Sequence, residues 1–247
     1  MSTSIYLGSP EGRVGKSMVA LGMIEALTRT VSSVGVFRPI VHAGAADAIL
    51  TTLVSEPSVN QTYEEAVGVT YDDIRADADA ALSTLVEKYA RIRESHEAVV
   101  ILGSDYTDIS SGTELTFNAR VAANLNAPVL LVVSGTGRDA ETVKSAAVSA
   151  IREFRSNHAE VLGVIANRVE PGILDEVRAK LAELDDVVTG VVPSNPVLIA
   201  PSVAQQFDAA KATLMQGSPG LLNRGPVSVL GASMTLPHAL RRLTPES

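Results

Sequence analysis

The sequence contains no cysteine and no tryptophan, and only 4% of its residues are aromatic. The absence of cysteine excludes a disulfide scaffold, a thiolate zinc site and thiol catalysis, and it favours a reducing compartment. The scarcity of aromatic side chains disfavours a surface on which nucleic-acid bases would stack. We therefore expect a cytoplasmic protein whose chemistry depends on hydroxyl, carboxylate, amide and cationic groups.

Basic clusters and long apolar runs are missing as well. The chain has 20 basic and 28 acidic residues, and no run of Lys or Arg exceeds Arg241–Arg242. Nucleic-acid binding requires a basic patch, so nucleic acid is not an expected partner. Mean hydropathy is +0.21, yet no apolar run reaches the roughly 18 residues of a spanning helix. A membrane is therefore not an expected partner either.

Short apolar runs recur along the first two hundred residues. They are rich in Val, Ile and Leu and predict strands over 5–7, 34–37, 98–102, 128–133, 161–166 and 187–191. Several of these runs are almost continuously apolar, which is typical of strands buried on both faces of a parallel sheet.

Helical patterns alternate with these strands, over 16–29, 72–94, 113–124, 139–155 and 172–184. In the clearest pattern, 72–94, apolar residues recur every three or four positions and form one buried stripe. Alternating strands and helices give right-handed crossovers. We therefore predict a doubly wound α/β fold, mainly parallel, with helices on both faces, as in P-loop NTPases.

The composition changes near the C-terminal end. Residues 216–226 are rich in Gly, Ser, Pro and Asn, which predicts a linker after a first domain over 1–215. One strand over 227–230 and one helix over 236–243 follow. A single strand and helix cannot bury their own apolar face, so we expect residues 227–247 to be the truncated start of a second domain.

The sharpest motif is a phosphate-binding loop, Gly8-Ser-Pro-Glu-Gly-Arg-Val-Gly-Lys-Ser17, between the first predicted strand and its helix. Backbone N–H groups and the positive end of the helix dipole hold phosphate in such loops. The residues expected to do so are Gly12, Val14, Gly15, Lys16 and Ser17.

Two side chains of this loop have distinct expected roles. Lys16 would reach the β- and γ-phosphates, and the Ser17 hydroxyl would ligate Mg²⁺. Pro10 stands where the standard spacing has glycine, which leaves a glycine-rich turn with a chance Lys-Ser pair as the alternative.

Other candidates follow the strands whose ends converge on the same crevice. Asp47 and Asp105, with Asp108 nearby, could complete a magnesium site or serve as turn or cap residues. Arg38 could face the phosphates or be an ordinary surface arginine. Asn167 could read a base edge with its carboxamide or be a turn residue.

A second glycine-rich turn, Gly135-Thr-Gly-Arg-Asp-Ala140, is similar to a dinucleotide-binding fingerprint. The acidic residue that the fingerprint requires is missing from the end of the next strand, so an ordinary turn is favoured. The four histidines have no metal-ligand spacing, and no Gly-x-Ser-x-Gly elbow occurs. These patterns therefore support neither zinc nor serine-hydrolase chemistry.

Taken together, the motifs resemble dethiobiotin synthetase. The resemblance rests on the phosphate loop, Val36-Phe-Arg-Pro39, Asp47 and Ile165-Ala-Asn-Arg168. It is closer still to the N-terminal dethiobiotin-synthetase-like domain of long bacterial phosphate acetyltransferases, particularly actinobacterial ones, and covers nearly the whole chain. Full-length members of that family interconvert acetyl-CoA and phosphate with acetyl phosphate and CoA.

The resemblance implies a regulatory and assembly region. In that family the transferase site lies in a C-terminal domain that this chain is expected to lack. The loop would bind ATP or another nucleotide with Mg²⁺, a small-molecule effector would be a partner, and the protein would be a homo-oligomer. One alternative is a stand-alone ATP- and Mg²⁺-dependent dethiobiotin-synthetase-like ligase, although Leu102-Gly103 replaces the Glu-Gly pair of that enzyme. The other is a structural domain with a vestigial loop.

Overall fold

The computed structural model describes residues 3–104, 111–199, 202–214, 218–225 and 234–242. Its contacts divide the chain into two compact units, Met1–Ser194 and Asn195–Ser247. This division falls earlier than the predicted domain end at residue 215. The linker over 216–226 and the second domain from residue 227 stay predictions, and the expected strand over 227–230 lies outside the described residues.

The first unit contains a seven-stranded sheet in the order β3-β2-β4-β1-β5-β6-β7. Every neighbouring pair is parallel, which confirms the predicted doubly wound α/β class. The strands are β1 (Thr3–Gly8), β2 (Val34–Val41), β3 (Val67–Thr70), β4 (Ala98–Leu102), β5 (Val129–Ser134), β6 (Val161–Val169) and β7 (Val188–Pro193). Because β1 is the central strand, the loop that follows it lies between the ends of β4 and β5.

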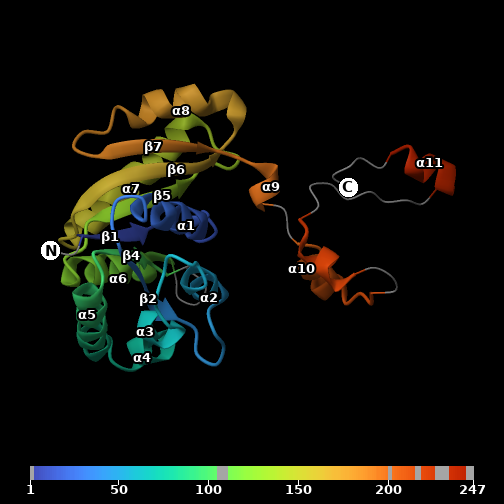
Figure 1. Ribbon diagram of the computed structural model, residues 1–247. Helices are drawn as coiled ribbons and strands as arrows, with labels where there is room; N and C mark the ends of the chain where they lie inside the picture. The colour runs from blue at the N-terminus through green and yellow to red at the C-terminus, as the bar shows by residue number, and fades with distance from the viewer. Residues whose placement is uncertain (1–2, 105–110, 200–201, 215–217, 226–233, 243–247) are drawn as a thin grey trace. The chain divides into compact units, whose positions relative to one another are not determined.

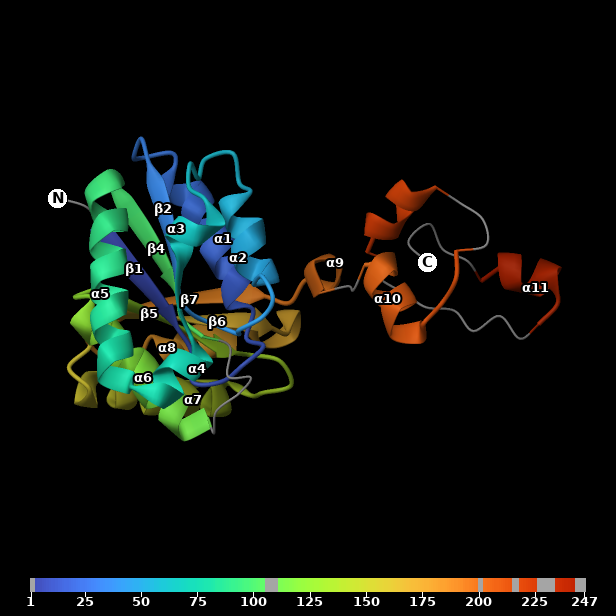
Figure 2. The same cartoon turned by 90° about the horizontal axis from the view of Figure 1, so that it is seen from below.

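Helices cover both faces of the sheet (Figure 1 and Figure 2). Adjacent residues of β1 point to opposite faces, so Tyr6 packs in one apolar core and Leu7 in the other. The Tyr6 core includes residues of α5 (Ala78–Ser95), α6 (Ser111–Asn124), α7 (Ala140–Ser156) and α8 (Leu174–Leu181), the last preceded by η1 (Pro171–Ile173). The Leu7 core includes residues of α1 (Lys16–Leu27), α2 (Ala48–Val54) and α3 (Tyr63–Ala66).

The single helix predicted over 72–94 is wrong, because the structure has two. They are α4 (Tyr71–Ala76) and α5, and Asp77 between them is extended, with φ −158° and ψ 103°. The Asp77 carboxylate accepts hydrogen bonds from the N–H groups of Asp79, at 3.1 Å, and Ala80, at 3.0 Å. An aspartate that caps the next helix in this way competes with helix continuation.

Three short elements beside β2, in the described part of the first unit, were not predicted. The strand β3 has four residues and the helix α3 also has four, which is too short for a periodic pattern. The helix α2 is hidden in a segment of mixed polarity and begins at a capping Asp47. These elements extend the first unit beside β2, where Arg38 pairs with Val67 across the β2–β3 ladder.

The second unit is described by itself. It contains α9 (Pro196–Ile199), α10 (Val203–Ala210), η2 (Pro219–Asn223) and α11 (Leu236–Leu240). A capping box between Ser202 and Gln205 begins α10, and the Val203 N–H donates to the Arg224 carbonyl at 2.8 Å. Across the residues that the structure describes, no helix is both long and apolar enough to cross a membrane.

Two glycines provide a test of the packing between β3 and its neighbours. A Cβ at Gly68 would lie 2.1 Å from the Pro39 carbonyl oxygen and 2.6 Å from Leu85 Cδ2. We expect Gly68→Ala to lower the free energy of unfolding, measured in urea, by about 2 kcal/mol or more, because one neighbour is a backbone atom and the other side chain, Leu85, is fully buried.

Gly22, in α1, is the control, because a Cβ built on it would have no atom within 4 Å. Gly22→Ala should raise the free energy by about 0.5 to 1 kcal/mol, and equal effects of the two changes would contradict this packing.

Candidate functional site

The predicted phosphate loop joins the central strand β1 to the amino end of α1. Gly15 forms the N-cap of α1 with φ 82° and ψ 29°, a left-handed conformation that glycine adopts at little cost. The first N–H groups of a helix have no partner within the helix and, with the dipole, attract anions. The loop therefore lies between a strand and the N-terminus of a helix, as the sequence predicted.

The end of β6 holds this loop from one side. Asn167 Nδ2 donates to the Val14 carbonyl at 2.8 Å, and Arg168 Nη1 donates to the Arg13 carbonyl at 3.1 Å. Peptide units are planar and trans, so the N–H groups of Val14 and Gly15 point away from β6. Two loop amides are thereby left on the side of the loop opposite the Asn167 and Arg168 side chains.

This arrangement gives Asn167 a role that the sequence did not predict. Its side chain is 6% exposed, and one amide hydrogen is engaged by the loop. A Cβ at Gly15 would lie 2.5 Å from Asn167 Nδ2, so glycine at this position allows the close approach. The expected contact of Asn167 with a base edge stays a prediction.

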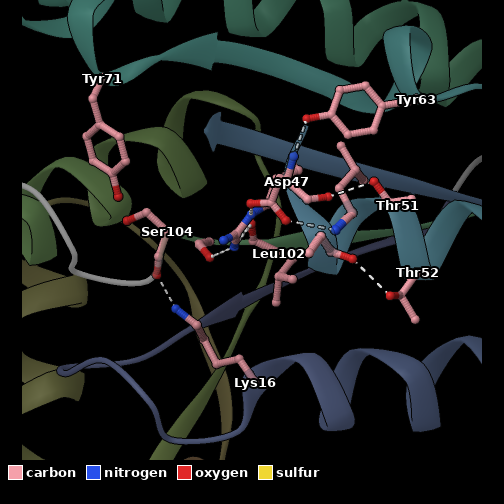
Figure 3. Close-up of polar contacts among 12 residues, drawn as sticks. Lys16, Asp47, Thr51, Thr52, Tyr63, Tyr71, Leu102 and Ser104 are labelled. Carbon is pink, nitrogen blue, oxygen red and sulfur yellow. Dashed lines mark hydrogen bonds and ion pairs between the residues drawn. The ribbon is translucent and has the colours of Figure 1, made fainter. Parts of the chain in front are cut away.

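Lys16 lies inside the molecule, with only 3% of its surface exposed. Its Nζ donates to the carbonyl oxygen of Ser104, directly after β4 (Figure 3). Ser17, next along α1, is partly exposed, and its hydroxyl has no hydrogen-bond partner among the described residues. The ammonium and the hydroxyl expected to contact phosphate and magnesium therefore begin the same helix.

Arg38 is also buried, and it lies within β2, which runs on to Val41 and not only to residue 37 as predicted. Its Nη1 donates to the carbonyls of Leu102, at 3.3 Å, and Gly103, and its Nε donates to Asp47 Oδ2 at 3.2 Å. The alternative of an ordinary surface arginine is therefore wrong. The guanidinium and the Lys16 ammonium both bind backbone carbonyls at the carboxyl end of β4.

Asp47 uses both of its carboxylate oxygens within the protein. Oδ1 caps α2 by accepting from the Leu50 N–H at 2.9 Å, while Oδ2 accepts from Arg38. The Asp47 N–H donates to the Tyr63 hydroxyl at 2.8 Å (Figure 3). The Arg38 guanidinium would compete with a metal ion for this carboxylate, because both carboxylate oxygens already accept hydrogen bonds. Metal binding by Asp47 therefore stays a prediction.

The other predicted carboxylates cannot be placed in the same way. Asp105 and Asp108 lie outside the described residues. Among the residues that the structure does describe, no cluster of three or more His, Asp or Glu side chains could hold a metal ion. Two of the predicted magnesium ligands, Ser17 and Asp47, lie among the described residues. Of these two, Ser17 is the one whose side-chain oxygen has no hydrogen bond to another described residue.

A buried polar network behind Lys16 was not predicted. The Tyr6 hydroxyl donates to Asn118 Oδ1 at 2.5 Å, which also accepts from the Ser104 N–H at 3.0 Å, and Asn118 Nδ2 donates to Ser104 Oγ at 2.7 Å. Burial raises the pKa of Tyr6, which keeps its hydroxyl a donor. The network fixes Ser104, the acceptor of Lys16. An asparagine among apolar positions of the predicted helix 113–124 was the available signal.

A second unpredicted contact joins the loop to the turn after β5. Arg138 Nη1 and Nη2 donate to Glu11 Oε1 and Oε2, at 2.6 and 2.7 Å. The hydrogen bonds to Glu11 raise the pKa of Arg138. Arg138 belongs to the turn Gly135–Ala140 that the sequence suggested was an ordinary turn. Its position shortly after a predicted strand indicated that it lies near the carboxyl end of the sheet, but not that it pairs with Glu11.

Comparisons with known proteins agree with this arrangement. A family model described as an AAA domain matches residues 3–202. The phosphate acetyltransferase of Synechocystis sp. is 26% identical over 254 residues, which cover 98% of this chain and 36% of that protein. The phosphate acetyltransferase of Escherichia coli is 25% identical over 269 residues, covering 97% and 38%. The chain thus spans little more than a third of these relatives.

Two solved structures are similar in fold. The MinC:MinD cell division protein complex of Aquifex aeolicus has a TM-score of 0.52 at 14% identity, over 86% of this chain and 88% of that chain. The signal recognition particle 54 kDa protein of Aeropyrum pernix, in complex with GDP, has a TM-score of 0.51 at 13% identity, over 78% and 42%. At these identities the likeness shows the fold alone, which is P-loop NTPase-like.

The close approach of Asn167 to Gly15 predicts that a methyl group at position 15 lowers the stability of the fold. Gly15→Ala introduces both an unfavourable φ and a clash with Asn167, whereas Gly137→Ala, at φ +65°, meets no atom within 4 Å. We expect Gly137→Ala to cost about 1 kcal/mol of unfolding free energy and Gly15→Ala to cost at least about 2 kcal/mol. Urea unfolding of both variants measures the difference. Equal losses of unfolding free energy in the two variants would mean that Gly15 is not in close contact with Asn167 of β6.

Proposed function

Because the chain belongs to the AAA domain family, we propose that its loop Gly8–Ser17 binds the phosphates of a nucleotide, ATP or a related one, as a magnesium complex. One observation carries this proposal. The carbonyls of Arg13 and Val14 accept hydrogen bonds from β6 side chains, so the N–H groups of Val14 and Gly15 point away from β6 and would be available to a ligand. Amides aimed in this way at the start of a helix bind phosphate oxygens.

Cationic side chains support the same proposal. Lys16 lies at the start of α1 and Arg38 within β2, and both donate to carbonyls at the carboxyl end of β4. A hydrogen bond between an ammonium and a phosphate is charge-assisted and stronger than one between neutral groups. A nucleotide phosphate near Lys16 would therefore gain such a bond.

Magnesium fits this site in part. Mg²⁺ prefers oxygen ligands and usually keeps several waters, and the Ser17 hydroxyl lacks a hydrogen-bond partner among the described residues. Bound there, the ion would neutralise phosphate charge. Asp47 would join it only by sharing its carboxylate with Arg38. The expected ligand Asp105 stays a proposal, as does the base contact of Asn167.

We further propose that the chain is the N-terminal, dethiobiotin-synthetase-like region of a phosphate acetyltransferase, with a role in regulation and in assembly of a homo-oligomer. The alignment of 98% of the chain with about a third of the Synechocystis enzyme supports this. We assign no acetyl transfer to these 247 residues. An actinobacterial kind of enzyme, a small-molecule effector and a cytoplasmic location remain predictions from the sequence.

The alternative function is that of an ATP-dependent ligase similar to dethiobiotin synthetase. Such an enzyme would hydrolyse ATP in a magnesium-dependent way, stimulated by a diamine or carboxylate substrate. A regulatory region would bind nucleotide with little turnover. An ATPase assay with and without such substrates distinguishes these functions, and the relatives found, which are phosphate acetyltransferases, favour the regulatory one.

Removal of the loop ammonium tests the binding proposal. We expect Lys16→Ala to abolish detectable binding of Mg·ATP in isothermal titration calorimetry, because the phosphates lose their charge-assisted partner. Lys88→Ala is the matched control. Like Lys16, Lys88 donates through Nζ to backbone carbonyls, here those of Val67 and Gly68, but Lys88 belongs to α5 and not to the loop. The control should bind as the wild type does.

Folding of the Lys16 variant must be checked separately because the side chain is buried. Far-ultraviolet circular dichroism and urea unfolding report whether the sheet is intact, and Lys16→Met keeps the length of the side chain without its charge. A folded Lys16 variant that binds Mg·ATP with unchanged affinity would refute the proposed site.

A further inference from the structure

Glu11 is an unexpected residue inside a loop that binds anions. It lies between Pro10 and Gly12, in the stretch where backbone amides would receive phosphate oxygens. A carboxylate at this position repels a polyphosphate, and the repulsion is strong where protein excludes water. A loop that carries Glu11 therefore needs a second group that removes its charge.

Arg138 is that group. Its two terminal nitrogens donate to the two oxygens of Glu11 at 2.6 and 2.7 Å, the planar fork in which arginine pairs best with a carboxylate. Nη1 also donates to the Ser134 carbonyl at the end of β5, at 3.3 Å. The side chains are 27% and 35% exposed, so solvent screens this pair only in part.

The turn that carries Arg138 is held in place by β6. The Gly135 N–H donates to the Asn167 carbonyl at 2.7 Å, and a Cβ at Gly135 would lie 2.8 Å from Val169 Cα. Asn167 thus binds the turn with its backbone and the phosphate loop with its side chain. The position of Arg138 relative to the loop is therefore fixed by a shared neighbour.

We infer that Arg138 is a positioning residue of the phosphate loop, which acts through Glu11. It cancels the charge that would repel a nucleotide phosphate, and it holds the first half of the loop against the turn after β5. The inference rests on the proposed function, since it assigns to the turn Gly135–Ala140 a part in the same nucleotide site.

A double-mutant cycle on the intact chain tests the inference with Mg·ATP and with inorganic triphosphate as probes. Arg138→Gln should weaken binding about tenfold, because Glu11 keeps its charge beside the phosphates. Glu11→Gln should bind as well as the wild type or better. The double variant should bind within about threefold of Glu11→Gln, because no charge remains for Arg138 to cancel.

Lys144→Gln is the matched control for loss of an ion pair. Lys144 pairs with Glu183 at 2.5 Å and is 26% exposed, similar to Arg138, and its removal should leave the affinity unchanged. Two outcomes would overturn the inference. One is an Arg138→Gln variant that binds as the wild type does. The other is a double variant as weak as Arg138→Gln, which would mean that Arg138 contacts the phosphates directly.

Amide hydrogen exchange without nucleotide separates this inference from the proposed function. Arg138→Gln and Glu11→Gln should each speed exchange in peptides that cover residues 8–15, and the double variant should speed it no further. A wild-type chain that binds neither probe would refute the proposed function. Unchanged hydrogen exchange in both single variants would refute the inference that Arg138 positions the loop through Glu11.

Discussion

The hydrogen bond from the Asn167 carboxamide to the Val14 carbonyl determines which way the phosphate loop faces. A loop that exposed its carbonyls to the ligand side would repel an anion, and here the carbonyls of Arg13 and Val14 are engaged by β6. The proposed phosphate site depends on this orientation, because the Lys16 ammonium would add to the attraction that the amides provide. Gly15 permits it by leaving space for Asn167.

The end of β4 has the complementary role of holding cations. Three successive residues, Leu102 to Ser104, offer carbonyls to Arg38 and Lys16, and the network of Tyr6 and Asn118 keeps Ser104 in place. Both cations are buried, and Arg38 also donates to the carboxylate of Asp47. The ammonium begins α1, where the positive end of the helix dipole would add to its attraction for an incoming phosphate.

The sequence predicted the sheet better than it predicted the site. Continuous apolar runs identified six of the seven strands. The pattern is clearest for β2 and β4, all of whose residues are buried, whereas the four residues of β3 are too few to show it. The order of residues in the loop predicted Lys16 and Ser17 at the start of α1. The pairing of Arg138 with Glu11 joins residues distant in sequence, and no local pattern indicates which charged side chains the fold will bring together. The break at Asp77 was missed because the apolar stripe continues across it.

The central place of β1 also affects how the chain acquires its site. The loop is encoded near the amino terminus, yet its partners are Ser104, Arg138 and Asn167, separated from it by 88, 127 and 153 residues. Contacts so remote in sequence form late and slow the folding of a parallel sheet. During synthesis the nascent chain presents the loop long before β6 leaves the ribosome. Under the proposed function, a nucleotide would therefore not help the earliest folding steps, and it would stabilise only a sheet that is already assembled.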